Sequence, residues 1–214
     1  MKLRQASTLM NRPGLHTLCK DDVLQERKSP YENYYKLTRC NNTWQYGLFV
    51  VENQNNPFFK EMQKFHSEAE GAKYFLFHRL SSYYFSERIR PFMISHSELD
   101  IGGPFFDLKK LKKAMSLIGI PPSIVSVGKV KELRLERKRI ALIKKDDGTF
   151  IVSFMNGNGE VIQSTMPVDY KRALFIIFKK VYLLHLFERE VSEWLEKENL
   201  RKYVSDRDIS IFLS

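Results

Sequence analysis

The chain has 214 residues, of which 43% are hydrophobic and 28% are charged, and its formal net charge at neutral pH is +10. This length suffices for one large domain or two small ones, and the composition is typical of a globular protein. The N-terminal residues contain no apolar segment suited to a signal peptide. The most apolar run, residues 173–187, is interrupted by two lysines and is shorter than the ~20 residues of a membrane span, so neither secretion nor membrane insertion is expected.

The cysteines and histidines argue against a metal centre. Cys19 and Cys40 have no C-x-x-C spacing, and the five histidines are scattered along the chain. A structural zinc site needs four suitably spaced ligands. We therefore expect a cytoplasmic protein with two ordinary thiols, no resident metal and no cofactor.

The N-terminal half is expected to contain few strands and one long helix. Residues 1–30 lack periodicity, which predicts an irregular arm or a short helix near Asp21. Residues 31–56 predict two short strands. A proline suited to the first turn of a helix comes next, followed by apolar residues at three- and four-residue spacing. A long amphipathic helix is expected over about residues 57–88, and Pro91 is expected to prevent its continuation.

The C-terminal half combines a basic helix, a sheet and a long helix. Residues 106–118 predict a helix with Asp107 as its N-cap. From residue 123 the hydrophobic period changes to two, and Asp-Gly and Asn-Gly pairs indicate hairpin turns, so an antiparallel β-meander is expected over about residues 123–166. The longest helix is expected over about residues 168–198, and the tail that follows it predicts a short edge strand.

These elements define an α+β fold class. The antiparallel meander would pack against the two long helices, with a small β element on the N-terminal side. The chain contains no internal repeat and no low-complexity linker. We expect an N-terminal α+β lobe of residues 1–104 and a second lobe of residues 105–214 with the basic helix, the sheet and the long C-terminal helix, or one continuous domain.

The positive charge is concentrated in one segment. Residues 109–145 contain twelve Lys and Arg side chains against two acids, so this segment carries +10 and the remainder sums to zero. A concentrated field attracts polyanions and accelerates their encounter. The helix and the sheet face of this segment are expected to present one exposed basic surface.

We interpret this surface as the binding site of a nucleic acid, either DNA or RNA, on a non-enzymatic accessory or regulatory protein. Lysine and arginine contacts to phosphate supply affinity that is largely independent of sequence. The expected phosphate contacts are Lys109, Lys110, Lys112, Lys113, Lys131, Arg134, Arg137, Lys138 and Arg139. The same side chains would also be explained as a solvated surface without a ligand.

Aromatic and basic residues alternate earlier in the chain. The residues that alternate are Tyr31, Tyr34, Tyr35, Lys36, Arg39, Trp44 and Tyr46. Exposed on a sheet face, such rings can stack unpaired bases. Buried, the same rings would be core residues.

A second interpretation is a metal-dependent nuclease. Glu68 lies in the first predicted long helix, Asp100 follows a short apolar stretch, and Asp107 and Lys109 come after a Gly-Gly turn. This order loosely resembles the PD-(D/E)xK nuclease pattern. The resemblance implies that the carboxylates hold Mg²⁺ and that the lysine orients or activates the attacking water. An N-cap and surface carboxylates would explain the same residues without catalysis.

A third interpretation is an adaptor or inhibitor that binds an acidic protein partner, through the basic surface or through Val191, Trp194 and Leu195.

A helix-turn-helix over residues 106–128 is disfavoured by its proline pair and its β-branched end. The chain contains no G-x-S-x-G, Walker A or Rossmann glycine pattern, which lowers the expectation of a hydrolase, NTPase or dehydrogenase. His185 is expected to be a hydrogen-bonded core residue.

Overall fold

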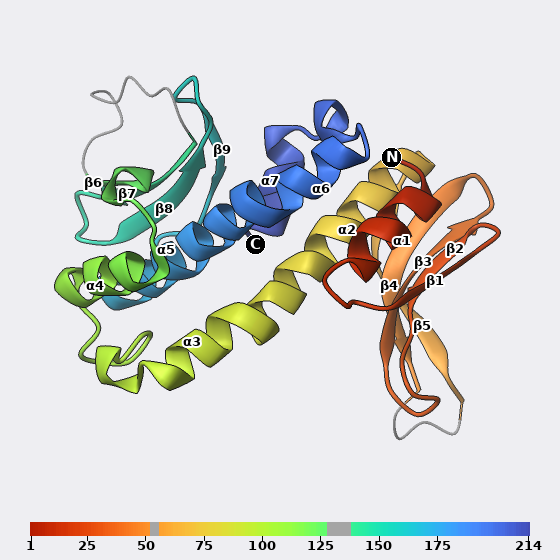
Figure 1. Ribbon diagram of the computed structural model, residues 1–214, viewed down its shortest axis with the longest axis horizontal. Helices are drawn as coiled ribbons and strands as arrows, with labels where there is room; N and C mark the ends of the chain where they lie inside the picture. The colour runs from red at the N-terminus through yellow and green to blue at the C-terminus, as the bar shows by residue number, and fades with distance from the viewer. Residues whose placement is uncertain (52–55, 128–137) are drawn as a thin grey trace. The chain divides into compact units, whose positions relative to one another are not determined.

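The computed structural model describes residues 1–51, 56–127 and 138–214 of the chain (Figure 1). The chain divides into two compact units. Met1–Leu80 and Trp194–Tyr203 form the first unit, and Ser81–Glu193 and Val204–Ser214 form the second. Each unit contains a β-sheet and helices, so the predicted α+β class is confirmed. The boundary predicted near residue 104 falls inside the second unit.

In the first unit a short helix precedes five antiparallel strands that pair in chain order. These elements are α1 (Leu3–Asn11), β1 (Thr17–Lys20), β2 (Val23–Glu26), β3 (Tyr34–Cys40), β4 (Thr43–Val50) and β5 (Phe58–Phe65). Asp21 lies in the tight turn between β1 and β2 with a positive φ of 49°. The expectation of an irregular arm or a helix near this residue is therefore wrong, because β1 and β2 pair as a hairpin.

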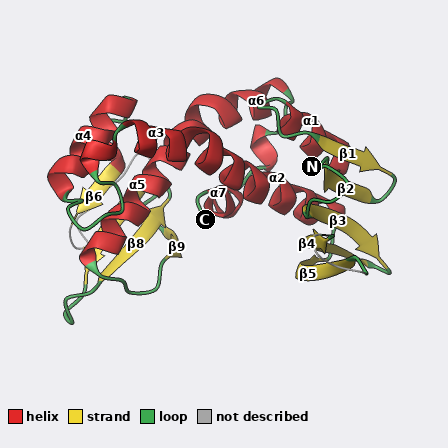
Figure 2. Cartoon of the chain, turned by 90° about the horizontal axis from the view of Figure 1, so that it is seen from below, coloured by secondary structure: helices red, strands yellow, loops and turns green. Residues whose placement is uncertain are grey.

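The inner face of this sheet packs against α1 and the first part of α2 (Glu68–Tyr84), as Figure 2 shows. Leu24, Leu37 and Tyr46 are fully buried on this face. A Cβ atom on Gly71 of α2 would lie 3.0 Å from Leu37 Cδ1, so the missing side chain allows the helix to approach the sheet closely.

Strand β5 corrects the predicted start of the long helix, which begins at Glu68 and not near residue 57. The strand pairs along its length with β4, and its register shifts opposite Tyr46 and Gly47, which leaves Met62 as an extra residue. A bulge of this kind changes which face the following side chains take. The apolar residues of β5 consequently lie three and four residues apart, which is the spacing expected of an amphipathic helix.

Helix α2 continues through a π-helical turn, η1 (Phe85–Ile89), into α3 (Arg90–Ser95). The backbone N–H of Arg90 donates to Phe85 O, five residues earlier, which is the π-helical bond. Pro91 follows in the first turn of α3 and does not prevent continuation, contrary to expectation. The proline directly follows the π-helical turn, and both features interrupt the regular hydrogen-bond ladder of a helix, so the interruption is confined to this stretch.

The second unit contains a four-stranded sheet with the order β6-β7-β8-β9. Its elements up to the long C-terminal helix are η2 (Ser97–Leu99), α4 (Leu108–Ile118), η3 (Pro122–Ile124), β6 (Val125–Val127), β7 (Arg139–Lys144), β8 (Phe150–Met155), β9 (Val161–Ser164) and α5 (Tyr170–Leu186). The strands β7, β8 and β9 are antiparallel as predicted, whereas β6 runs parallel to β7, with Val125 opposite Ile140. An alternating pattern predicts the face that a side chain takes but not the direction of its strand.

Helix α5 continues through a second π-helical turn, η5 (Phe187–Val191), into α6 (Ser192–Lys197), in agreement with the predicted long helix. The 3-10 turn η6 (Arg201–Tyr203) and helix α7 (Asp206–Phe212) follow. The predicted edge strand in this tail is wrong. The hydroxyl of the residue before α7 and the carboxylate of Asp208 form a capping box, which stabilises a helix start.

Candidate nucleic-acid interface

Helix α4 is held in place by its ends and by its apolar side. The Asp107 carboxylate accepts a hydrogen bond of 2.8 Å from the backbone N–H of Lys110, so its predicted role as N-cap is confirmed. Gly119 ends the helix with a φ of +80°. Leu111 and Met115 are buried on the side that packs against α5. The opposite side of α4 is left to the solvent.

Three lysines share that exposed side. Lys109, Lys112 and Lys113 are exposed, and their spacing of three and four residues places them on one face of the helix, which we call the α4 lysine face. Lys110 is half-buried at its edge. The helix contains no acidic residue, and within the described ranges none of these four ammonium groups takes part in an ion pair.

This arrangement is unfavourable for the helix itself. Lys109 and Lys110 lie in the first turn, where the helix dipole favours negative charge by about 0.3–1 kcal/mol per residue. Like charges three or four residues apart, such as Lys109 and Lys113, add about 0.2–0.5 kcal/mol of repulsion per pair. The electrostatics of the helix therefore disfavour lysine at these positions.

The remaining predicted phosphate contacts lie at or before the start of β7. Lys138 Nζ is 3.3 Å from Asp206 Oδ1, so part of its charge is balanced within the second unit. Arg139 is half-buried, and its Nε has no hydrogen-bond partner among the residues described. The predicted contacts Lys131, Arg134 and Arg137 fall outside the described residues. Helix α4 therefore brings together four of the nine predicted phosphate contacts.

Each carboxylate of the nuclease interpretation accepts a hydrogen bond from a backbone N–H. Asp100 has a positive φ of 53°, and its Oδ2 accepts a hydrogen bond of 2.6 Å from Phe105 N–H. Asp107 caps α4, and Glu68, in the first unit, accepts from Leu3 N–H at 2.9 Å. Across the described part of the chain, no three His, Cys, Asp or Glu side chains gather in a way suited to a metal ion.

The chain segment after α4 does not supply a second helix for DNA. The turn η3 and strand β6 follow it, so the helix-turn-helix interpretation is wrong. The proline pair at residues 121–122 accounts for this, because the second proline starts a 3-10 turn and the β-branched residues after it extend into a strand.

The aromatic residues of the first sheet divide between its two faces. Tyr46 is buried on the inner face, stacked on Tyr35 at 5.6 Å between ring centroids. Tyr34 lies on the other face, where it stacks on Phe49 at 5.1 Å, and the ammonium of Lys36 lies 5.9 Å from the same Phe49 ring. The core interpretation therefore holds for Tyr46. Of the predicted stacking residues that lie in strands, Tyr34 is the one on the side away from the helices.

A buried polar network between this sheet and α2 was not predicted. Glu26, 2% exposed, accepts from Arg79 Nε at 2.7 Å and from Tyr35 N–H at 2.9 Å. Tyr46 Oη and His78 Nδ1 are 2.8 Å apart, and burial raises the pKa of the Tyr46 hydroxyl. These polar atoms bind one another, so the network joins helix to sheet and offers no open site. Sequence spacing could not reveal it, because its members come from four separate elements.

His185 departs from expectation. Its Nε2 is buried and has no hydrogen-bond partner among the described residues. Burial, and secondarily the positive charge of Arg189, lower the pKa of this imidazole below its usual value. The side chain is therefore expected to stay neutral at physiological pH.

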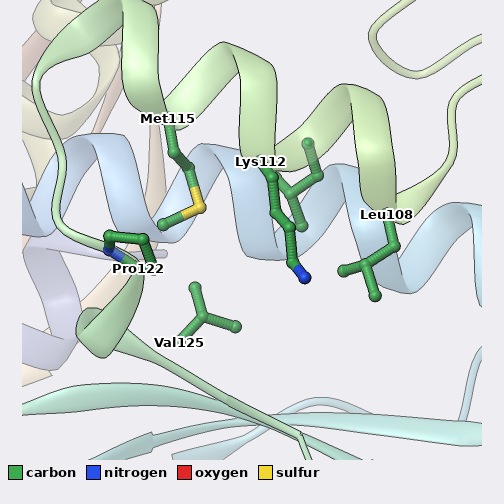
Figure 3. Close-up of a pocket in the computed structure, with 6 residues that line it drawn as sticks. Leu108, Lys112, Met115, Pro122 and Val125 are labelled. Carbon is green, nitrogen blue, oxygen red and sulfur yellow. The ribbon is translucent and has the colours of Figure 1, made fainter.

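A pocket of about 360 Å³ lies beside the α4 lysine face (Figure 3). It opens between α4 and the segment formed by η3 and β6, and five of its six lining side chains are apolar. The lining residues are Leu108, Leu111, Lys112, Met115, Pro122 and Val125. The apolar stripe of α4 predicted core packing and not a cavity, because the pocket depends on where the later segment lies.

Comparison with known protein families, curated proteins and solved structures found no match to this chain. No helix in the described part of the chain combines the length and the apolar composition needed to cross a bilayer.

Proposed function

We propose that the protein is a non-enzymatic accessory or regulatory protein that binds the phosphate backbone of a nucleic acid, DNA or RNA, through the α4 lysine face. The single observation that carries this proposal is the arrangement of four lysines in the first six residues of α4 without one acid. An ammonium held on a rigid helix serves as a point contact to phosphate. A cytoplasmic location fits the two cysteines, neither of which is in a disulfide.

The energetic balance supports a ligand for these lysines. Their positions oppose the helix dipole and repel one another, which together reduce the stability of α4 by about 1–3 kcal/mol. A polyanion reverses the sign of both effects when it binds, since it neutralises the lysines and meets the positive end of the dipole. Binding is expected to be insensitive to base sequence and strongly sensitive to salt.

The decisive experiment reverses two charges of the α4 lysine face. In the Lys109→Glu/Lys113→Glu variant, affinity for labelled DNA and RNA oligonucleotides should fall equally for all sequences. The slope of log K against log salt should decrease by about two, one for each lost phosphate contact. Fluorescence anisotropy over a salt series measures both quantities.

The matched control is Lys28→Glu/Lys60→Glu, which changes the net charge equally at two exposed lysines of the first unit. This control should retain most of the affinity and the original salt slope. Equal weakening in the two variants would mean that only net charge matters and would contradict a site on α4.

The same lysine face supports a second candidate, an adaptor or inhibitor that binds an acidic protein partner. A salt-sensitive complex with an acidic protein, without any complex with DNA or RNA, would favour it. The nuclease alternative requires that Asp100→Ala or Lys109→Ala abolish Mg²⁺-dependent cleavage while affinity is kept. It has less support, because Asp100 and Asp107 each bind a backbone N–H.

A further inference from the structure

The pocket beside α4 has the size and the lining of a small-molecule site. Its volume of about 360 Å³ lies within the usual range for such sites. Leu111 and Met115, only 1% and 3% exposed, belong to the buried side of α4. Leu108 and Val125 are half-buried and face each other across the opening (Figure 3). The apolar atoms lining this space would lose contact with water when an apolar group enters.

Among the described residues of the lining, Lys112 is the one that carries a charge. Its side chain extends from α4 toward the sheet, and its ammonium lies between Leu108 and Val125 (Figure 3). The side chain is exposed, apolar side chains lie on either side of its ammonium, and in the described part of the chain the ammonium has no ion-pair partner. Lys109 and Lys113 add to the positive potential at this side of α4. A ligand that places a negative group at the opening and an apolar group inside satisfies both parts of the site.

We propose that this pocket binds an apolar carboxylate of medium chain length. The acyl chain contacts Leu111 and Met115, and the carboxylate lies at the Lys112 ammonium. Apart from Lys112, the side chains that line the pocket within the described residues are apolar and offer no hydrogen-bonding group to a polar ligand body, so we assign polar recognition to the head group. A single lysine matches a singly charged head group. This ligand goes beyond the nucleic-acid proposal and does not depend on it.

A chain-length series on the unaltered protein tests the proposal. Hexanoate, octanoate and decanoate should bind with a dissociation constant that falls about fourfold for each added methylene until the pocket is full. The matching primary amides have the same chains without charge, and they should bind about fivefold more weakly. The methyl resonance of Met115, observed by NMR with each ligand, should shift upon saturation. Absence of a saturable shift with decanoate, or an affinity independent of chain length, would overturn the proposal.

Two variants of neighbouring lysines separate the pocket from general charge. Lys112→Met should remove the preference for carboxylate over amide. Lys113→Met, which removes the same charge from a residue that does not line the pocket, should keep that preference. Loss of the preference in both variants would assign it to the field of α4 and contradict a site at Lys112.

A third variant fills the pocket from its rim. Leu108→Trp replaces a half-buried side chain with a larger one and should abolish decanoate binding while the melting temperature of the protein stays the same. Retained binding with the unaltered shift of Met115 would contradict the proposed location. Lys113→Met also distinguishes the two proposals, because it should weaken nucleic-acid binding and leave decanoate binding intact.

Discussion

Lys180 illustrates at the scale of one residue how burial sets a pKa. The side chain lies on α5, 7% exposed, and its Nζ donates to Gln163 Oε1 at 3.0 Å and to Leu213 O at 2.9 Å. Burial, and secondarily the charge of Lys179, lower the pKa of the ammonium to about 8. Neither acceptor is an anion, so the charge is retained only through neutral hydrogen bonds.

This shift predicts a rise in stability with pH. Between pH 8 and pH 10.5 the unfolded chain keeps the proton on Lys180 while the folded chain releases it. Since the unfolded state then binds more protons, the free energy of unfolding should increase with pH, by up to about 3 kcal/mol over the full window. Urea unfolding from pH 7 to pH 9 measures this slope about one unit below the ordinary pKa of tyrosine.

The variant Lys180→Met should lose most of this pH dependence, because its side chain does not titrate. Lys179, whose pKa is also lowered by burial, should retain a smaller slope of the same sign. The control Lys171→Met removes an exposed lysine from the same helix and should retain the slope of the unaltered protein. An undiminished slope in Lys180→Met would assign the pH dependence to another group.

At the scale of the element, the start of α4 combines a good N-cap with unsuitable charges. Asp107 caps the helix, and Lys110 occupies the third helical position, where a glutamate would complete a capping box and match the dipole. The protein therefore carries a helix that could be more stable than it is. Natural proteins are rarely at their stability optimum, and under the proposed function these lysines serve phosphate contacts and not the stability of α4.

The substitution Lys110→Glu should consequently separate stability from binding. The free energy of unfolding should rise by about 0.5–1 kcal/mol, while affinity for nucleic acid falls. Urea unfolding and fluorescence anisotropy measure the two effects on the same preparation. The neutral Lys110→Gln should give a smaller change of both quantities with the same signs. A destabilised Lys110→Glu would show that Lys110 supports the fold.

Some strands and helices could be predicted from local sequence signals, and others could not. The N-cap of α4 and the hairpin between β7 and β8 could be predicted, because a cap or a tight turn depends on a few adjacent residues. Strand β5 could not, because the register shift beside Met62 hides its alternation. Gly47, opposite this bulge, has no room for a Cβ, which would lie 2.2 Å from Lys60 O. Such a close approach exists only once both strands are paired.

At the scale of the whole molecule, the chain passes between the two units more than once. Residues 194–203 return to the first unit, and residues 204–214 return to the second. Helices α2 and α6 each contribute residues to both units. Because a helix melts cooperatively along its length, we expect the two units to unfold in one transition.

The position of the tryptophans allows a direct test of this coupling. Trp44 and Trp194, the two tryptophans of the chain, both belong to the first unit, so their fluorescence reports on that unit. Phe212 belongs to the second unit, fully buried, with its ring centroid 5.7 Å from Tyr84 and 5.5 Å from Phe187. Phe212→Ala should reduce stability by about 3–5 kcal/mol and shift the fluorescence midpoint in urea accordingly. An unchanged fluorescence midpoint, with a changed far-ultraviolet circular dichroism midpoint, would show that the units unfold separately.

As with the fold, the local features of the candidate site could be predicted from the sequence and its long-range contacts could not. The lysines of α4 could be placed on one face from their spacing, since Asp107 and the apolar stripe already defined the helix. The ion pair between Lys138 and Asp206 and the pocket at Lys112 could not, because each joins residues from separate elements.

By itself the sequence determined the α+β class, the exposed lysines of α4 and the position of the long C-terminal helix. Those features follow from caps, turns and hydrophobic periods that act within a few residues. Only the tertiary structure decided that β6 runs parallel to β7, that Pro91 continues a helix after a π-helical turn, and that α4 borders an apolar pocket. These outcomes depend on which distant segments meet, and the free energy of such contacts is not contained in any local stretch of residues.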